Sequence, residues 1–267
     1  MAPFKPVSRS FEIESLAYPF ERNFSSKFIF DGELHDFIEL VYIKSGAVEV
    51  VKEETIYLVD GGTILFHAPM EFHKIKSAKG TSPKVYNLSM RVRGALPDGI
   101  YDHLFSLDLR LEERFISAFS KARDFLEESA PKEIGQLATL ELEALIIDIC
   151  RSSAHHGKVL STSAAKAYRA VIEAMESEIY SNVSLEEIAR RVNISRSYLK
   201  ALFSKFCDLS PKEYYRKLRL REAIRLLAEG ASVSKIAEMM NFSYPNHFTQ
   251  FFKNETGLSP TEYRARL

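Results

Sequence analysis

Residues 184–206, SLEEIARRVNISRSYLKALFSKF, decide the fold of the C-terminal part of the chain. The stretch Ser184–Glu187 has the pattern of a capping box, which predicts the start of a short helix. A polar turn around Asn193 follows, and Ser195 is placed to cap a second helix. The apolar stripe of this second helix is Leu199, Leu202 and Phe203. A short helix, a tight turn and a second helix form the helix-turn-helix pattern.

The same pattern occurs again in residues 236–264, IAEMMNFSYPNHFTQFFKNETGLSPTEYR. Asn193 recurs as Asn241, 48 residues later, and both fall in the predicted turns, where Asn tolerates a left-handed backbone. A long helix is predicted between the copies, over Pro211–Glu229, and Gly230 suits the left-handed position that ends it. Internal repeats mark duplicated supersecondary units, so two helix-turn-helix units are expected.

The second helix of each unit, over Ser195–Phe206 and Tyr244–Asn254, is the candidate recognition helix. Their predicted outer faces carry side chains that can reach base edges or phosphates, namely Arg196, Ser197, Lys200, Asn246, His247 and Gln250. The connecting helix would span about 28 Å at about 1.5 Å per residue. Because successive major grooves lie about 34 Å apart, one chain could contact two of them.

The charge of the chain is divided unequally along its length. The whole sequence holds 36 basic and 36 acidic residues, a balance that by itself argues against a nucleic-acid partner. Residues 1–162 hold 19 basic and 24 acidic residues, whereas residues 163–267 hold 17 and 12. This asymmetry indicates one module that faces nucleic acid. We therefore predict a first domain over residues 1–158, a linker over 159–164 and a DNA-binding domain over 165–267; the motifs described below predict that the first domain is cupin-like, binds an effector and dimerises.

These C-terminal residues resemble the DNA-binding domain of the AraC/XylS family of bacterial transcription regulators. The resemblance covers about 100 residues and rests on residues 184–206, LSPKEYYRKLRLREAIRLL at 209–227, and residues 236–264. It implies double-stranded DNA as a partner and adds Ala201 to the base-contacting face of the first unit. Because Ala201 is too small for hydrogen-bonded readout, we expect the first unit to read fewer bases.

The N-terminal half has the pattern of short strands separated by turns. Val85–Arg93 alternates between apolar and polar residues, and Lys44–Gly46 and Asp60–Gly62 carry hairpin turn signals. The other predicted strands are Phe37–Ile43, Ala47–Val51, Thr55–Val59 and Thr63–Phe66. This pattern is typical of a small antiparallel β-barrel or jelly roll. Together the two halves predict an α+β protein with two domains, the second of them all-α.

Two helices are predicted after the strands, over Leu111–Glu128 and Glu133–Ser152. The second is apolar around much of its circumference, which is more apolar surface than one face of a barrel covers. We therefore predict a homodimer through Glu133–Ser152, with Leu145 and Ile146 on the dimer face.

The order His35-x3-Glu39, Gly46, Gly62-x6-Pro69-x3-His73 resembles the half-motifs of cupins, in the form seen in AraC-type sensor domains. A barrel mouth is a common place for a small-molecule pocket. The candidates to line it are His35, Glu39, Tyr42, His67 and His73, although a slip of one residue in strand facing would exchange every assignment.

Metal binding at this site is a weaker hypothesis. Cupin enzymes hold a metal with three His and one carboxylate, and here His35, Glu39 and His73 could supply three ligands. Phe37 occupies the position of the second His, so we expect no metal and no other cofactor. His67 is expected to be an ordinary histidine at the rim of the barrel.

The leading interpretation is a bacterial transcription regulator, not an enzyme, whose DNA binding responds to a small effector and which contacts RNA polymerase. Two alternatives remain: a metal-dependent cupin enzyme with a DNA-tethering domain, and a constitutive DNA-binding protein whose barrel serves only for dimerisation. Cys150 and Cys207 are too few for a disulfide framework, Met1–Leu16 lacks the pattern of a signal peptide, and no apolar run approaches a membrane span. A cytoplasmic location is therefore expected.

Overall fold

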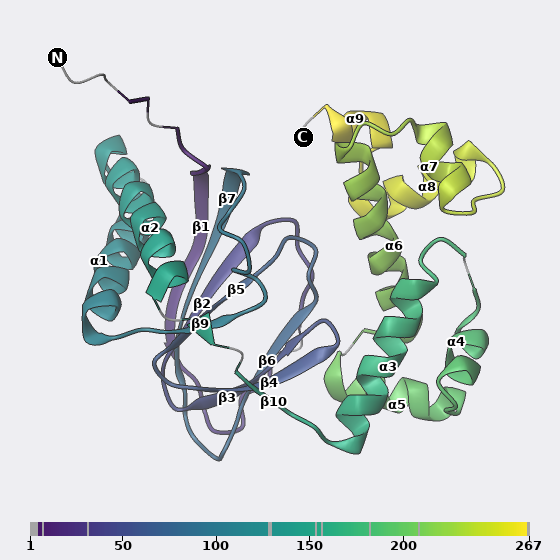
Figure 1. Ribbon diagram of the computed structural model, residues 1–267, viewed down its shortest axis with the longest axis horizontal. Coiled ribbons are helices and arrows are strands. Elements are labelled where there is room, and N and C mark those ends of the chain that lie inside the picture. Colours follow the sequence, from purple (N-terminus) through teal and green to yellow (C-terminus); the bar gives the residue numbers. More distant parts are fainter. Residues whose placement is uncertain are drawn as a thin grey trace. The chain divides into compact units, whose positions relative to one another are not determined.

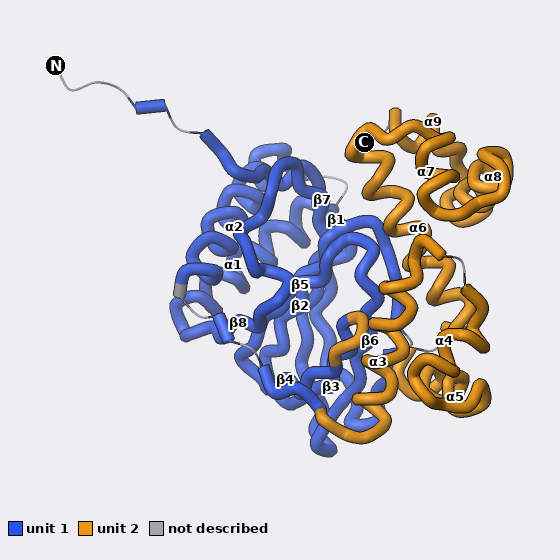
Figure 2. Tube along the Cα trace, turned by 45° about the vertical axis from the view of Figure 1, so that its right-hand side comes forward, with its two compact units in different colours: residues 1–52, 56–160 blue, residues 53–55, 161–267 orange. Residues whose placement is uncertain are grey.

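The computed structural model describes residues 5–6, 8–30, 32–127, 130–152, 154–155, 157–181, 183–207 and 209–265. The chain divides into two compact units, coloured blue and orange in Figure 2. Unit 1 comprises residues 1–52 and 56–160, and unit 2 comprises residues 53–55 and 161–267. Antiparallel sheets with two following helices make up unit 1, and unit 2 is helical, which confirms the predicted α+β class.

Unit 1 contains two antiparallel sheets rather than one closed barrel in its described residues. The six-stranded sheet has the order β1-β7-β2-β5-β8-β9, and the four-stranded sheet has the order β10-β4-β3-β6. The strands are β1 (Phe11–Asn23), β2 (Ile38–Ser45), β3 (Ala47–Lys52), β4 (Thr55–Asp60), β5 (Thr63–His67), β6 (His73–Ser77), β7 (Lys84–Gly94), β8 (Leu104–Ser106), β9 (Ala154–His155) and β10 (Lys158–Val159).

The two glycine turns that the sequence marks as hairpins are corners between the sheets. β2 and β3 belong to different sheets, and so do β4 and β5, so the predicted hairpins are wrong. The turns contact each other, because the amide of Gly61 donates to the carbonyl of Gly46 at 2.8 Å. A Cβ on Gly61 would lie 2.7 Å from Cα of Ser45, which explains the glycine there. A turn signal reports that the chain reverses, but not which strands then pair.

The six-stranded sheet buries apolar side chains on both faces. Tyr86, Leu88 and Met90 of β7 face a core shared with the helices, while Asn87 and Ser89 point to the other side, as the alternation predicts. A second core, between the two sheets, includes Val41, Ile43, Val48, Val50, Leu65, Ile75 and Val85. Neighbouring residues of β2 therefore lie in different cores. Val41 and Ile43 face the core between the sheets, whereas Tyr42 faces the core shared with the helices.

Helices α1 (Leu109–Phe125) and α2 (Lys132–Ser152) lie together beside β1 (Figure 1). Leu145 and Ile146 of α2 are fully buried in the core of unit 1, so their predicted place on a dimer face is wrong. The exposed apolar side chains of α2 are instead Leu137 (46% exposed), Leu140 (38%) and Ile147 (41%). The helix is apolar around its circumference because one side packs on its own unit and another forms this exposed stripe.

Unit 2 consists of helix pairs arranged around one long helix, as the repeat predicts (Figure 1). Its helices are α3 (Ser163–Ser177), α4 (Leu185–Arg191), α5 (Arg196–Phe206), α6 (Pro211–Ala228), α7 (Val233–Met239), α8 (Pro245–Thr256) and α9 (Pro260–Arg264). The pairs α4–α5 and α7–α8 are the two helix-turn-helix units. Asn193 and Asn241 adopt positive φ angles of 54° and 55° in the two turns, and Gly230 has φ 86° after α6, so these predictions are confirmed.

Side-chain caps fix where the helices of unit 2 begin. Ser184 and Ser195 each accept a hydrogen bond from an amide three residues later. Ser210 and Ser259 go further, because Glu213 and Glu262 reach back to complete a capping box at equivalent points of the two repeats. Within the described residues of both units, no helix combines the length and apolar character needed to cross a bilayer.

Candidate functional site

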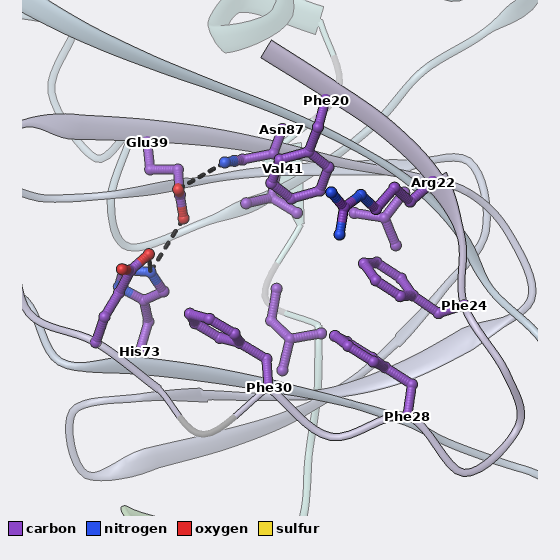
Figure 3. A pocket seen from close by; sticks show the side chains of 12 residues that line it. Phe20, Arg22, Phe24, Phe28, Phe30, Glu39, Val41, His73 and Asn87 are labelled. Carbon is purple, nitrogen blue, oxygen red and sulfur yellow. Dashed lines mark hydrogen bonds and ion pairs between the residues drawn. The ribbon is translucent and has the colours of Figure 1, made fainter. Parts of the chain in front are cut away.

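A cavity of about 210 Å³ lies in unit 1 between the two sheets, and Figure 3 shows its lining side chains. Its walls come from β1, β2, β6 and β7 and from the segment that joins β1 to β2. The lining residues are Phe20, Arg22, Phe24, Phe28, Phe30, Glu33, Glu39, Val41, His73, Ile75, Val85 and Asn87. The cavity is thus aromatic over much of its wall, with polar groups toward opposite ends (Figure 3).

Glu39 and His73 form the polar end of the cavity. Glu39 is held by Asn87, whose Nδ2 donates to Oε1 at 2.7 Å, while its Oε2 lies 3.0 Å from Nε2 of His73. Burial disfavours the charged form of His73, but contacts with the carboxylates of Glu33 and Glu39 outweigh it and raise its pKa to about 9. The neighbouring His73 in turn lowers the pKa of Glu33. Glu33, Glu39 and His73 are therefore linked electrostatically, and Asn87 holds Glu39 by a hydrogen bond.

His35 completes this polar cluster without lining the cavity itself. Its Nδ1 lies 3.0 Å from the carbonyl of Phe37, and its ring stacks on the Phe37 ring with centroids 3.7 Å apart. One donor atom from each of Glu33, His35, Glu39 and His73 lies within 4.8 Å of the others. Glu33 is the member that sequence reasoning missed. It reaches the cluster because residue 33 forms an isolated β-bridge with His73.

Two of the predicted pocket residues lie elsewhere. Tyr42 occupies the opposite face of β2 and packs edge-to-face on Phe115 of α1 at 5.0 Å, so its prediction as a lining residue of this cavity is wrong. His67 is fully buried behind His73, with ring centroids 3.9 Å apart, and is not a rim residue as expected. Its Nδ1 lies 2.7 Å from Oε1 of Glu71, and burial holds its pKa well below the ordinary value.

The aromatic wall was also missed by the sequence analysis. Phe20 is on β1, and Phe24, Phe28 and Phe30 follow in the segment that joins β1 to β2. The rings of Phe24 and Phe28 stack with centroids 3.7 Å apart. The density of Phe between residues 20 and 30 was a usable signal, but the segment has no clean period of two or of 3.6.

A buried lysine, Lys52, lies next to Glu71, the partner of His67. Nζ of Lys52 donates to the carbonyls of Phe66 at 2.8 Å and Tyr101 at 2.6 Å, and it lies 3.6 Å from Oε2 of Glu71. Glu71 thus contacts both Lys52 and His67. A buried charge of this kind is stable only while its partners remain, so the network ties β3, β5 and the segment before β8 together.

The candidate DNA interface is formed by α5 and α8 of unit 2. Leu199, Leu202 and Phe203 of α5 are buried, as are Phe248 and Phe252 of α8, so the opposite faces of both helices are exposed. All seven predicted DNA-contacting residues lie on these exposed faces: Arg196, Ser197, Lys200, Ala201, Asn246, His247 and Gln250. The structure is thus compatible with each of these assignments, and DNA contact by them stays a prediction.

Some of these side chains already have protein partners. Nη1 of Arg196 lies 2.6 Å from Oε1 of Glu186 on α4, and Nε2 of Gln250 donates to Oδ1 of Asn254 at 2.6 Å. Both contacts are exposed and therefore weak enough to be exchanged for DNA groups. Tyr198 and Tyr244 are also exposed on these helix ends and were not among the predicted contacts.

Comparison with known protein families gives a clear result. A family model described as an AraC-like ligand binding domain matches residues 25–190, and one described as a helix-turn-helix domain matches residues 188–266. The chain belongs to the AraC family. The first match includes nine of the twelve residues that line the cavity of unit 1, all but Phe20, Arg22 and Phe24, and the second includes both α5 and α8.

Relatives of this AraC-family chain are named as regulators. It is 31% identical to the HTH-type transcriptional regulator GbdR of Pseudomonas aeruginosa over 169 residues, which are 60% of this chain and 45% of GbdR. The chain thus spans less than half of the length of GbdR. It is 26% identical to the HTH-type transcriptional activator RhaS of Escherichia fergusonii over 242 residues, 86% of each chain. A solved structure of ToxT from Vibrio cholerae is similar at 15% identity and a TM-score of 0.40, covering 97% of this chain and 99% of ToxT.

Proposed function

We propose that this AraC-family chain is a bacterial transcription regulator that binds specific promoter DNA and responds to a small molecule. The observation that carries the proposal is the duplicated helix-turn-helix of unit 2, in which α5 and α8 each present an exposed polar face. The regulators GbdR and RhaS support the same function by sequence similarity. The enzyme alternative gains no support from these relatives, and we propose that the chain is not an enzyme.

The geometry of α6 supports binding to two successive major grooves. Its 18 residues span about 27 Å at about 1.5 Å per residue, close to the spacing of about 34 Å between grooves on one face of the duplex. Residues 163–267 hold 17 basic and 12 acidic residues, so phosphate contacts would add affinity that does not depend on sequence. Base contacts from α5 and α8 would then provide the specificity.

The cavity of unit 1 is the proposed effector site. Its volume of about 210 Å³ is below the roughly 300–1,000 Å³ of sites for drug-sized ligands, so the ligand would be smaller than these, and the Phe side chains favour an apolar or aromatic body. Arg22 lines the cavity with its guanidinium 5.7 Å from the Phe20 ring centroid, and no carboxylate among the described residues pairs with it. An anionic group on the ligand would supply that partner. Binding would change DNA affinity through a coupling free energy of typically about 1–3 kcal/mol.

We further propose that the active form is a homodimer through α2, with Leu137, Leu140 and Ile147 at the interface. A groove between α1 and α2 includes Leu137 and Leu140 and carries both Arg114 and Glu141. A surface with apolar residues flanked by both charge signs can pair with its own copy across a two-fold axis. Once bound beside a promoter, the dimer would contact RNA polymerase.

The proposal is tested by selecting genomic DNA fragments that bind the full-length protein, followed by affinity measurements at physiological salt. We expect a specific site that binds at least about 1,000-fold more tightly than random DNA. Gln250→Ala should weaken binding to this site by about 1–3 kcal/mol and relax the preference at one position, whereas Gln136→Ala, at an exposed helical site in unit 1, should change neither. Binding no tighter than to random DNA would refute the function. Specific binding that no small molecule alters would instead support a constitutive DNA-binding protein.

A further inference from the structure

We propose that Glu33, His35, Glu39 and His73 form a binding site for one divalent transition-metal ion at the polar end of the cavity. The proposal goes beyond the regulatory function and does not depend on it, because the site lies within unit 1. It also revises the expectation from sequence that no metal binds, which rested on Phe37 at the position of the second His. The structure supplies a fourth donor two residues before His35 instead of two residues after it.

The spacing of the donor atoms fits a metal ion. One donor atom from each of the four residues lies within 4.8 Å of the other three. Ligands at about 2.0–2.2 Å from a metal are at most about 4.4 Å from each other. The widest donor pair would therefore close by a few tenths of an ångström if it lay trans across the ion, and by more than an ångström in a tetrahedral site, where ligands lie about 3.3–3.6 Å apart.

Backbone hydrogen bonds to Nδ1 of His35 and His73 orient both rings so that Nε2 faces the cluster. Nδ1 of His35 lies 3.0 Å from the carbonyl of Phe37, and Nδ1 of His73 lies 3.3 Å from the carbonyl of Glu71. A carbonyl oxygen can only accept, so Nδ1 carries the hydrogen in both rings and Nε2 is directed to the cluster. Metal-ligating histidines are held in this manner by a partner on the other ring nitrogen.

Neither Nε2 atom accepts a hydrogen bond from a neutral donor among the described residues. Each faces carboxylate oxygens instead. Within the described part of the chain, Nε2 of His35 is buried and makes no hydrogen bond, and the nearest carboxylate oxygen, on Glu33, is 3.8 Å away. Nε2 of His73 lies 3.0 Å from Oε2 of Glu39. A nitrogen lone pair facing a carboxylate oxygen is repulsive unless a proton or a metal ion lies between them. The cluster therefore requires positive charge.

The donor set indicates the class of ion. Two imidazoles and two carboxylates, with no thiolate, suit Zn²⁺, Fe²⁺, Ni²⁺, Co²⁺ or Mn²⁺ rather than Cu⁺. Two carboxylates also neutralise a divalent charge. Glu39 is fixed from behind by the amide of Asn87 at 2.7 Å, so three of the four ligands have an outer hydrogen-bond partner. Because Glu33, Glu39 and His73 line the cavity, the ion would face the proposed effector site.

The test is a Co²⁺ titration of the full-length protein, purified with a chelator and then freed of it, without DNA. We expect one Co²⁺ per chain, visible as d–d absorption and displaced by Zn²⁺. Glu33→Gln and His35→Asn should each weaken binding at least about 10-fold, and Asn87→Ala, which removes only an outer partner, should weaken it by about 10–100-fold. His103→Asn and Glu238→Gln lie outside the cluster and should bind as the wild type does.

Folding is checked separately, because His73 is buried and its replacement could unfold unit 1. Glu33 has a partly exposed side chain, so Glu33→Gln should keep the wild-type melting temperature in the presence of chelator. The ion should raise the melting temperature of the wild type and not that of this variant. Absence of stoichiometric Co²⁺ in the folded wild type would overturn the proposal. Unchanged affinity in both Glu33→Gln and His35→Asn would overturn it as well.

Discussion

Asn193 and Asn241 lie 48 residues apart and adopt the same left-handed backbone conformation, with φ angles of 54° and 55°. Each follows the short first helix of its unit and precedes the recognition helix. After each Asn, the next amide closes the turn: Ile194 donates to the carbonyl of Ala189 at 3.0 Å and Phe242 to that of Ala237 at 2.9 Å. The two repeats thus preserve the geometry that sets the angle between their helices.

Replacing Asn193 tests this geometry. Asn193→Ala should lower the free energy of unfolding of unit 2 by about 1 kcal/mol, because a left-handed conformation is costly for a residue with a Cβ and no local polar group. Asn193→Gly should be neutral or slightly stabilising, since glycine adopts this conformation readily. Urea unfolding followed by helical circular dichroism measures both, with exposed Ser204→Ala as the control. Equal loss in the Ala and Gly variants would argue that the Asn side chain, not the backbone, is what matters.

Replacing the buried Lys52 of unit 1 should lower the free energy of unfolding by more than replacing Asn193 does. Lys52→Met should destabilise unit 1 by about 3–5 kcal/mol, because it leaves Glu71 and the carbonyls of Phe66 and Tyr101 without their cationic partner. Replacing Lys52 and Glu71 together by Met and Gln should cost less than the sum of the single changes. Thermal unfolding of the wild type, the two single variants and the double variant gives the coupling free energy between Lys52 and Glu71. Strict additivity would show that the two side chains do not act as a pair.

The dimer proposal distinguishes two sides of α2. Leu140→Asp should convert a dimer to a monomer while the fold remains, because Leu140 is on the exposed stripe. Leu145→Ala should keep the dimer and lower the free energy of unfolding by about 2–5 kcal/mol, because it opens a cavity in the core of unit 1. Sedimentation and denaturant unfolding separate the two effects. A dimeric Leu140→Asp protein would place the interface elsewhere.

The two recognition helices should contribute to DNA binding in different ways. Asn246→Ala should cost about 1–3 kcal/mol and relax sequence preference at one position of the site. Lys200→Ala should weaken binding to all sequences evenly and reduce the salt dependence by about one unit of slope, if Lys200 contacts phosphate. Binding to single-base variants of the selected site, at several salt concentrations, measures both. Position-specific loss with Lys200→Ala would identify it as a base contact.

Cys150 on α2 should react slowly with thiol reagents. Burial raises the pKa of its thiol to about 11, so only a small fraction is the reactive thiolate at pH 8. Raising the pH toward 11 should accelerate labelling, and denaturant should make both Cys150 and the buried Cys207 react at the rate of free cysteine. Mass spectrometry of the labelled protein identifies the site. Rapid labelling of Cys150 in the native protein at pH 8 would contradict its burial.

The helical unit was predictable because its signals are local. Caps such as Ser210 with Glu213, the apolar stripe of α5 and the turn at Asn193 each depend on residues a few positions apart. The strands were harder. β1 was missed because its register shifts between Ile13 and Ser15 and again between Ala17 and Phe20, which breaks the alternation that identifies a strand.

The pocket shows the same limit. Glu39 and His73 line the same cavity, as their spacing suggested, whereas Tyr42 does not, since one step along β2 exchanges the cavity for the helix-facing core. Arg22 and Glu33 come from a segment without regular periodicity, so only the tertiary fold brings them to the cavity. Similarly, the sequence shows that α2 is apolar around its circumference. It does not show which face of the helix is buried, because that depends on the packing of α2 against β1 and α1.

The corners at Gly46 and Gly61 have a consequence for the rate of folding. Since β2 and β3 enter different sheets, as do β4 and β5, the six-stranded sheet must be assembled from distant segments, such as β1 with β7, where Phe11 pairs with Gly94. Chains dominated by such contacts fold slowly, whereas helical units with local contacts fold fast. Upon refolding, the helices of unit 2 should therefore form well before the cavity of unit 1, although ribosomes synthesise them last.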